Sequence, residues 1–464
     1  MSIIHVDKMR MSLAEIAKIT DGELFYSNSE LIKNISLDSR EIEAGTLFVA
    51  IKGERFDGHD FIGKAFEDGA AAIVCERIPY KVKGNVILVD NSLYAFGAIA
   101  KNHKNQIAPL TVGITGSVGK TTTKQFVWSV LREKYVTHKT DGNFNNEIGL
   151  PITILRMPCD TQALVLEMGM SFKDEISRLS QIAEPDIAVI TNIGSSHIEN
   201  FGSREGIRDA KMEIAHGLKE GGKLVLNGDE PLLSGIDGAV YVSVENENSD
   251  YRAVNVEEND GYYLFDIMTK AGTVKGFRIN VLGIHNVYNA VVAYAVGKLA
   301  DMDDESIKAG LLNFENAAMR QNIYENNGYT VIEDCYNASP ESMVASLKVL
   351  CQKGKEAKKI AILGDMLELG SYSETFHRNV GEKVAQLGIN KLYTFGEMAE
   401  YIGKGAIEAG MDESNVVSIT DLEKPELLAD LLAKEVENND TLLFKASRGV
   451  KLERITAILC NKEG

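Results

Sequence analysis

The sequence predicts an α/β protein of three domains, with a parallel sheet in the central domain and a doubly wound, Rossmann-like sheet in the C-terminal one. A chain of 464 residues is too long for one hydrophobic core and suits three domains of about 150 residues each. Strand-like apolar runs alternate with helical stretches, which is typical of βαβ units with parallel strands. We expect the domains to span residues 1–108, 109–316 and 317–464.

The composition narrows the class of protein. A formal net charge of −18 would be repelled by nucleic acids and by anionic membrane surfaces, so neither is an expected partner. The five cysteines are odd in number and form no CxxC pair, which indicates a reducing compartment without disulfides or structural zinc. No signal-peptide core opens the chain, and no apolar run reaches membrane-spanning length. We therefore expect a cytoplasmic protein and not a membrane protein. We also expect a monomer, although the composition does not bear on the oligomeric state.

The first domain has short elements of its own. Residues Met11–Ile19 predict a helix, with Ser12 as its cap and Glu15 three residues further on. Apolar runs at residues 45–53 and 70–75 predict strands.

Polar residues between these elements are open to two interpretations. Residues 56–61 predict a polar loop. Ser39, Arg40 and His59 could contact a phosphorylated ligand, but caps and surface turns would equally explain them.

The most informative stretch runs from Pro109 to Tyr135. Apolar residues alternate over residues 110–114, as in a strand entering a sheet, and recur at helical spacing over residues 126–131. Between these two patterns lies a glycine-rich segment, residues 113–122. The order strand, glycine-rich loop and helix predicts a nucleotide-binding phosphate loop.

Each residue type in this loop has a chemical purpose. Glycines let successive N–H groups point at phosphate oxygens, and the helix N-terminus adds the positive end of its dipole. Lys120 would neutralise the outer phosphates, and the Thr121 hydroxyl could ligate Mg²⁺. Ile114 stands where the usual pattern has a glycine, so the loop is a variant. The predicted nucleotide-binding residues are Gly113, Ile114, Thr115, Gly116, Ser117, Val118, Gly119, Lys120, Thr121 and Thr122.

Further polar residues follow predicted strands of the central domain. Residues 140–149 are rich in asparagine and could form either a turn or a site for hydroxyl and phosphate oxygens. Glu167 ends an apolar strand, where parallel sheets place functional groups, although a chance acid would look the same. His197 follows the next strand and is either structural or a metal ligand. By its spacing alone, Lys211 would be a snorkelling surface lysine.

The last part of the central domain and the C-terminal domain complete the pattern. A helix from residue 284 would place Asn286 and Asn289 one turn apart, where an amide cap is the simpler explanation. No GxGxxG sequence opens the C-terminal domain, so a dinucleotide site is not predicted. The strands expected in that domain are Tyr329–Asp334, Ile360–Leu363, Lys391–Phe395, Val416–Ile419 and Thr441–Lys445.

Several segments, taken in order, resemble the Mur ligase family over essentially the full length of the chain. Those of the central domain are GITGSVGKTTTK, TDGNFNNEIGLP, LEMG, NIGSSHIENFGS and GIHNVYNA. Those of the outer domains, similar to family members that add a dipeptide, are SLDSREIEAGTLFVAIKGERFDGHDFI, DCYNASPESM, LGDMLELG and KASRGVKLERI. Two positions depart from the family pattern: Ser339 replaces an asparagine, and Gly449 replaces a bulkier residue.

The resemblance implies an ATP-dependent amide ligase of peptidoglycan precursor synthesis, and hence a role in cell-wall biogenesis, cell shape and cell division. ATP would phosphorylate the terminal carboxylate of UDP-N-acetylmuramoyl-tripeptide, and the amine of D-alanyl-D-alanine would attack the acyl phosphate. The first domain would bind the UDP-substrate, the second ATP and the third the dipeptide.

The resemblance also assigns roles to individual residues. Lys120, His197 and Lys211 would be catalytic. The Mg²⁺ ligands would be Thr121, Glu167, His197 and a carbamylated Lys211. Asn289 and Arg320 would contact the adenosine and Asp334 the ribose. The implied substrate-binding residues are Ser39, Arg40, Asn143, Asn145, Asn146, Asn337 and Lys445.

Two other functions remain open from the sequence. A sister ligase on the same scaffold would add a different amino acid to another carboxylate, and the segments GDMLELG, DSR and FDGHDF favour the dipeptide-adding enzyme instead. A phosphate-loop switch would hydrolyse or bind nucleotide without stimulation by any acceptor, and it would leave the third domain and the segment from His197 to Lys211 without a role.

Overall fold

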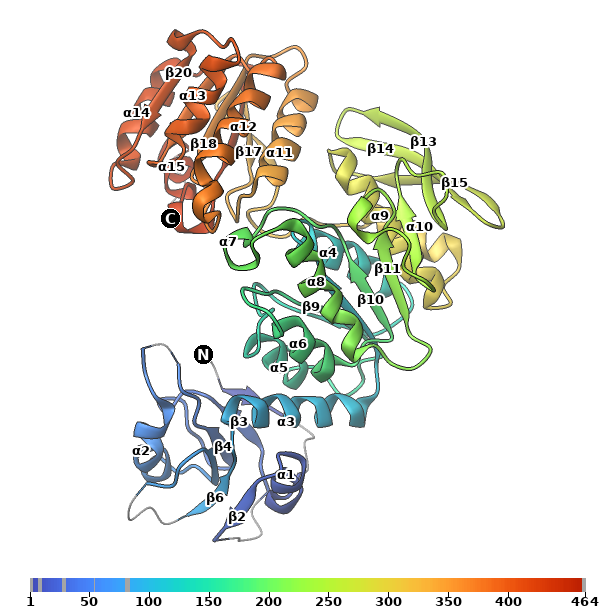
Figure 1. Ribbon diagram of the computed structural model, residues 1–464, viewed down its shortest axis with the longest axis vertical. Helices are drawn as coiled ribbons and strands as arrows, with labels where there is room; N and C mark the ends of the chain where they lie inside the picture. Colours follow the sequence, from blue (N-terminus) through green and yellow to red (C-terminus); the bar gives the residue numbers. More distant parts are fainter. Residues whose placement is uncertain (1–2, 7–10, 27–30, 54, 80–83, 461–464) are drawn as a thin grey trace. The chain divides into compact units, whose positions relative to one another are not determined.

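A computed structural model of the chain describes residues 3–6, 11–26, 31–53, 55–79 and 84–460. The chain forms two compact units, which we describe separately (Figure 1). The first unit comprises residues 1–114, 135–188 and 213–223, and the second comprises residues 115–134, 189–212 and 224–464.

The first unit begins with a six-stranded sheet in the order β1–β3–β4–β5–β6–β2. The four central strands are parallel, and β1 and β2 pair antiparallel at the edges. The strands are β1 (Ile4–His5), β2 (Glu23–Phe25), β3 (Asn34–Ser36), β4 (Thr46–Val49), β5 (Ala72–Cys75) and β6 (Asn85–Leu88). The helices are α1 (Leu13–Ile19), α2 (Ile62–Glu67) and α3 (Ser92–Ile107).

The capped helix near the start of the chain is confirmed, with a shifted start. Helix α1 begins at Leu13 rather than at Met11, because Ser12 is its N-cap. The Ser12 hydroxyl accepts from the Glu15 N–H at 3.3 Å, and the Glu15 carboxylate accepts from the Ser12 N–H at 2.7 Å. The loop expected at residues 56–61 is partly wrong, since Gly58–Phe61 forms a 3₁₀ helix capped by the Asp57 carboxylate.

The rest of the first unit includes three parallel strands, two α-helices and the 3₁₀ helix Glu213–Gly217. Strand β9 (Ala163–Glu167) pairs with both β7 (Leu110–Thr115) and β8 (Thr137–Lys139). Helices α5 (Gly149–Leu155) and α6 (Glu175–Ala183) both contact α3 (Figure 1). The strands predicted from the alternation at 110–114 and from the apolar run ending at Glu167 are therefore present.

In the second unit, parallel pairing gives way to an antiparallel meander that the sequence analysis did not predict. Strand β12 is parallel to β11 and β13, whereas β13, β14 and β15 pair antiparallel. The strands are β10 (Ile187–Ile190), β11 (Lys223–Asn227), β12 (Val240–Ser243), β13 (Tyr251–Asn259), β14 (Tyr262–Thr269) and β15 (Gly272–Ile279). The helices are α4 (Lys120–Leu131), α7 (Ile198–Phe201), α8 (Arg204–Met212), α9 (Ile284–Leu299) and α10 (Asp304–Leu312).

The C-terminal part of the second unit confirms the doubly wound sheet. Its six strands run in the order β16–β17–β21–β18–β19–β20, and only the β16–β17 pair is antiparallel. The strands are β16 (Asn322–Asn326), β17 (Tyr329–Glu333), β18 (Lys359–Gly364), β19 (Lys391–Phe395), β20 (Val416–Ile419) and β21 (Thr441–Lys445). The helices are α11 (Pro340–Lys353), α12 (Ser373–Gln386), α13 (Glu400–Glu408), α14 (Pro425–Glu435) and α15 (Glu453–Leu459).

Both faces of this sheet are covered, because alternate residues of one strand enter different cores. Ala361 and Leu363 of β18 pack with residues of α11, α12 and α13. Ile360 and Ile362 of the same strand pack with residues of α14 and α15. The carboxyl ends of β17 and β21 carry Asp334 and Lys445 toward the site described below. Among the described helices, none is both long enough and apolar enough to cross a membrane.

Candidate functional site

The phosphate loop has the backbone that its glycines predict. Gly116 has a φ of +151° and Gly119, which precedes α4, has a φ of +85°, a region that favours glycine. A methyl group at Gly116 would lie 1.9 Å from the Thr191 hydroxyl oxygen, so a side chain has no room there. Gly119 has no side chain to cap α4, which leaves the helix N-terminus suited to an anion.

The loop is held by residues that follow β10. The Asn192 backbone carbonyl accepts from the Ser117 N–H at 3.1 Å, and its side-chain oxygen accepts from the Val118 N–H at 2.9 Å. The Thr191 hydroxyl donates to the Val118 carbonyl at 2.6 Å. These bonds fix the loop before a ligand binds, which reduces the ordering cost of binding.

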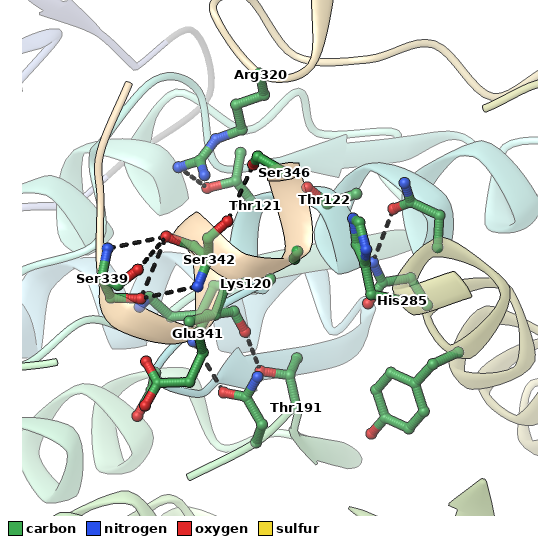
Figure 2. A pocket seen from close by; sticks show the side chains of 18 of the residues that line it. Lys120, Thr121, Thr122, Thr191, His285, Arg320, Ser339, Glu341, Ser342 and Ser346 are labelled. Carbon is green, nitrogen blue, oxygen red and sulfur yellow. Dashed lines mark hydrogen bonds between the residues drawn. The ribbon is translucent and has the colours of Figure 1, made fainter. Parts of the chain in front are cut away.

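A cavity of about 550 Å³ opens beside this loop, within the second unit (Figure 2). The sequence-predicted residues that line it are Ser117, Val118, Gly119, Lys120, Thr121, Thr122, Asn289, Arg320, Asp334, Asn337 and Lys445. Gly113, Ile114 and Thr115 lie in β7 and are buried. The structure thus brings the phosphate loop, α9 and the strand ends of the C-terminal sheet to one cavity.

Two cationic side chains meet the phosphate loop. Lys120 donates to the Gly116 carbonyl at 2.8 Å. The Arg320 guanidinium donates to the Thr121 hydroxyl at 3.0 Å (Figure 2). It also lies 4.2 Å from the centre of the Tyr336 ring. Stacking on this ring orients the guanidinium plane. A phosphate group in the loop would therefore meet positive charge from both α4 and the segment before β16.

Asp334 and Lys445 form a partly buried ion pair at the carboxyl ends of β17 and β21. Their closest atoms are 2.6 Å apart, the Lys445 side chain is only 3% exposed, and Ser346 also donates to the Asp334 carboxylate. Burial alone would raise the pKa of Asp334, but Lys445, Ser346 and Arg320 outweigh it and hold that pKa below its usual value.

We expect Lys445→Met to lower the free energy of unfolding by about 3 kcal/mol, because a carboxylate that is only 16% exposed loses its closest cation. Urea unfolding at neutral pH would measure the loss. The double variant Lys445→Met/Asp334→Asn should recover part of it. The pKa of Asp334 is lower in the folded protein than in the unfolded chain. The ion pair therefore contributes its full stability at pH values above the usual pKa of an aspartate, and this contribution is lost as the pH falls through the lowered pKa. Equal stability of the single variant and the wild type at neutral pH would contradict this prediction.

Lys211 is not a surface lysine, so the interpretation from spacing alone is wrong. It lies near the end of α8 and is only 2% exposed. Ile207 and Ala210 of the same helix are buried as well. Burial, and secondly the positive charge of Lys120, lower its pKa well below the usual lysine value. The site therefore favours the neutral amine, which is the nucleophilic form.

His197 lies in the turn before α7 and has a φ of +63°. Its Nδ1 atom is 2.8 Å from a carboxylate oxygen of Glu368, which comes from the loop after β18. Contact with His197 lowers the pKa of Glu368. Burial acts in the opposite direction but is the smaller effect, so the pKa stays below its usual value. The imidazole therefore has a carboxylate close by, although its Nδ1 atom makes no hydrogen bond of regular geometry with the described residues.

The remaining predicted residues lie in the first unit. Glu167 is buried at the end of β9 and accepts from the Asn145 side-chain amide at 2.9 Å. The Asn146 side chain accepts from the Gly149 N–H at 2.8 Å and so serves the start of α5. The Asn143 carbonyl accepts from the Asn145 N–H at 2.7 Å. The asparagine-rich segment is therefore a structured turn that also holds Glu167.

Near the first sheet, His59 is a buried residue of the 3₁₀ helix Gly58–Phe61 and not a residue of a surface turn. Its Nδ1 atom lies 2.6 Å from the Asp57 carboxylate, and its Nε2 atom accepts from the Glu76 N–H at 2.9 Å. Ser39 is buried. Arg40 is 80% exposed and binds the neighbouring Asp38 carboxylate through two nitrogens.

Other cavity residues were not predicted from the sequence. They come from the ends of β10 and β11, the start of α9, the segment before β16 and the start of α11, and include Thr191, Asn192, Asn227, Asp229, His285, Asn286, Tyr288, Gln321, Glu341, Ser342 and Ser346. Asn192, His285, Tyr288, Glu341 and Ser342 lie in segments that carry the family resemblance. Asn286 carried a further signal, since it lies one turn before Asn289, and the Asn289 amide donates to its oxygen at 3.1 Å.

Three family models match the chain. The Mur ligase family catalytic domain matches residues 31–105, the Mur ligase middle domain matches residues 114–297, and the Mur ligase glutamate ligase domain matches residues 319–448. The chain belongs to the Mur ligase family. It is therefore an enzyme of the ligase class.

Relatives and solved structures resemble this Mur ligase over nearly its whole length. The UDP-N-acetylmuramoyl-tripeptide–D-alanyl-D-alanine ligase of Bacillus subtilis (strain 168) is 41% identical over 453 residues, covering 96% of this chain and 98% of the relative. A crystal structure of MurF from Acinetobacter baumannii has a TM-score of 0.89 and 29% identity, covering 98% of this chain and all of that one. MurF ligase from Thermotoga maritima in complex with ADP has a TM-score of 0.83 and 32% identity, covering 92% of this chain and 97% of that one.

The implied metal ligands of this Mur ligase come from both units. Glu167 belongs to the first unit, whereas Thr121, His197 and Lys211 belong to the second. In the part of the chain that the structure describes, no three His, Cys, Asp or Glu side chains are grouped as a metal site would need.

Proposed function

We propose that this Mur ligase joins D-alanyl-D-alanine to the terminal carboxylate of UDP-N-acetylmuramoyl-tripeptide, using ATP, in peptidoglycan precursor synthesis. The observation that carries the proposal is the cavity beside the phosphate loop, in a chain that matches a ligase with this name at 41% identity over 96% of its length. The ADP complex of the Thermotoga maritima relative supports a nucleotide as the ligand of the cavity.

We also propose three domains with separate ligands. Residues 1–108 would bind the UDP-substrate, residues 109–316 ATP, and residues 317–464 the incoming dipeptide. The family models support this division, because each of the three matched segments falls within one proposed domain. Ser39, Arg40, Asn143, Asn145 and Asn146 would serve the UDP-substrate, and Asn337 and Lys445 the dipeptide side.

The proposed reaction has two steps. A carboxylate oxygen of the tripeptide attacks the γ-phosphorus of ATP, the bond to the β-γ bridging oxygen breaks, and ADP leaves. The dipeptide amine then attacks the acyl phosphate, and the tetrahedral intermediate expels inorganic phosphate as the amide forms. The first step brings two anions together, so Lys120 and the N-terminus of α4 would have to neutralise the charge. Asn289 and Arg320 would contact the adenosine of ATP, and Asp334 its ribose.

Mg²⁺ is the metal that the candidate ligands fit. Thr121, Glu167 and a carbamylated Lys211 offer oxygen atoms, which a hard dication prefers, and His197 adds a nitrogen. The buried Lys211 supports this set, since its neutral amine could attack CO₂ and release a proton to give a carbamate. Bound there, Mg²⁺ would offset the charge of the phosphates. Asn145 would keep the Glu167 carboxylate oriented through its 2.9 Å bond.

We further propose that the enzyme acts in the cytoplasm as a monomer. All five cysteines are free thiols, which supports a reducing compartment. Sedimentation of the purified enzyme would test the monomer.

Phosphate release tests the function directly. With Mg²⁺ present, we expect release only when ATP, UDP-N-acetylmuramoyl-tripeptide and D-alanyl-D-alanine are all supplied, and a return to background when any one is omitted. Single amino acids in place of the dipeptide should not support turnover. Turnover with a single amino acid would favour a sister ligase, and release that no acceptor stimulates would favour a nucleotide switch.

A further inference from the structure

A chain of side-chain hydrogen bonds leads from the helix of the phosphate loop to the segment that enters the C-terminal sheet. The Thr123 hydroxyl of α4 donates to the Asn289 oxygen at 2.9 Å, and the Asn289 amide donates to the Asn286 oxygen at 3.1 Å. The Asn286 amide donates to the Gln321 oxygen at 3.1 Å, and the Gln321 amide donates to the Leu282 carbonyl at 2.8 Å. We call these four side chains the amide relay.

The relay has one direction. Each amide accepts through its oxygen and donates through its nitrogen, so turning one amide over would place two donors or two acceptors together. Asn286 is held further by a second bond to the Leu282 carbonyl at 2.7 Å. Thr123, Asn286 and Asn289 are all buried. A buried network of this kind is stable only when every member is paired, so its members depend on one another.

Gln321 anchors the linker that follows the central part of the unit, residues 316–321. The backbone of this linker is unusual, since Met319 has a φ of +58° and Gln321 a φ of +47°. Non-glycine residues hold such angles only where the surroundings fix them. The Asn316 side chain donates to the Gln321 carbonyl at 3.3 Å, and β16 begins at the next residue, Asn322. The Gln321 side chain is thus bound to α9, while its backbone continues into the C-terminal sheet.

The residue before Gln321 is the one that reaches the phosphate loop. The Arg320 guanidinium donates to the Thr121 hydroxyl, so the placement of the linker also sets the placement of this cation. Asn289, Arg320 and Gln321 all line the same cavity. The relay therefore links two groups that the proposed function assigns to the adenosine.

We propose that Gln321 is a positioning residue for the nucleotide, which holds Asn289 through Asn286 and holds Arg320 through the linker backbone. This rests on the proposed function only in taking the cavity as the nucleotide site. Gln321 itself needs no contact with ATP. Its loss should weaken nucleotide binding and leave the chemical step and the second substrate unaffected.

The test replaces Gln321 by methionine, which keeps the length of the side chain and removes both hydrogen bonds. We expect Gln321→Met to raise KM for ATP about tenfold, the effect of losing two neutral hydrogen bonds. The Kd of ADP, measured by titration calorimetry, should rise by the same factor. The kcat and KM for UDP-N-acetylmuramoyl-tripeptide should stay within about twofold of the wild type. Gln386→Met is a matched control, because Gln386 is exposed on α12 and its side chain bonds to the neighbouring Glu382 and Lys383.

A double-mutant cycle separates positioning from a local packing effect. Thr123→Val removes the other end of the relay and keeps the side-chain shape. If the relay acts as a unit, Thr123→Val combined with Gln321→Met should weaken ADP binding by clearly less than the product of the two single effects. Independent, multiplicative effects on Kd would overturn the proposal. An unchanged Kd in Gln321→Met, or an equal rise in both substrates' KM values together with a fall in kcat, would also overturn it.

The two proposals can fail separately. If the wild type bound ADP but released no phosphate with the proposed substrates, the proposed function would be wrong. The cycle on the Kd of ADP would still decide the role of Gln321.

Discussion

Lys120→Ala is expected to reduce turnover about 10²-fold or more, in line with the loss of one preorganised charge at the transferring phosphate. The Lys120 ammonium is held at the Gly116 carbonyl by a 2.8 Å bond, so it is already placed at the loop before ATP arrives. The loss should persist at saturating ATP, because the charge acts on the transition state as well as on binding. Phosphate release with all three substrates would measure it.

Lys404→Ala is the matched control, because Lys404 is 42% exposed on α13 and bonds to Glu400. It should leave turnover unchanged. Normal turnover of Lys120→Ala at saturating ATP would contradict a catalytic role for the phosphate loop.

Most of the fold could be predicted from the sequence because its strongest signals are local. The alternation before the phosphate loop and the apolar runs of the C-terminal strands each indicate one element. The meander β13–β15 was missed although Asp260-Gly261 is a two-residue hairpin signal between alternating segments. A βαβ pattern requires a helix between successive strands, and no helix separates the strands of this antiparallel meander.

The site could be predicted only where a motif marked it. Lys120 and Thr121 belong to a recognisable loop. Asp334 and Lys445 lie at the carboxyl ends of the paired strands β17 and β21. Gln321 carries no such signal, since its side-chain partners are 35 and 39 residues away in the chain. Such contacts are set by tertiary packing.

The burial of Lys211 shows the limit of spacing more sharply. A lysine among apolar neighbours on a helix can extend to solvent or lie inside, and helical spacing is the same in both cases. What decides is whether other segments cover that face of α8, and these come from elsewhere in the chain. The chemical consequence is a lysine whose pKa is lowered by burial and by Lys120.

We expect Lys211 to act as a carbamate rather than as an ammonium. An ammonium beside Mg²⁺ would be repelled, and more strongly where water is excluded, whereas a carbamate supplies an anionic oxygen ligand. Lys211→Ala should therefore lose about 10²-fold or more of its activity. A short-chain carboxylate in the buffer should restore part of that activity by replacing the missing oxygen. Lys211→Arg, which keeps the positive charge, should be inactive and should not respond to the carboxylate.

The carbamate can also be detected without turnover. Wild-type enzyme equilibrated with ¹³C-labelled CO₂ should give a carbamate carbon signal by NMR, and Lys211→Ala should lack it. Lys104→Ala is the control for a buried lysine with another role, since Lys104 donates to the Ala183 carbonyl at 2.6 Å; this variant should keep the signal. If Lys211→Arg turned over normally, Lys211 would be a phosphate-facing cation, because the arginine keeps the positive charge but has no neutral amine to form a carbamate.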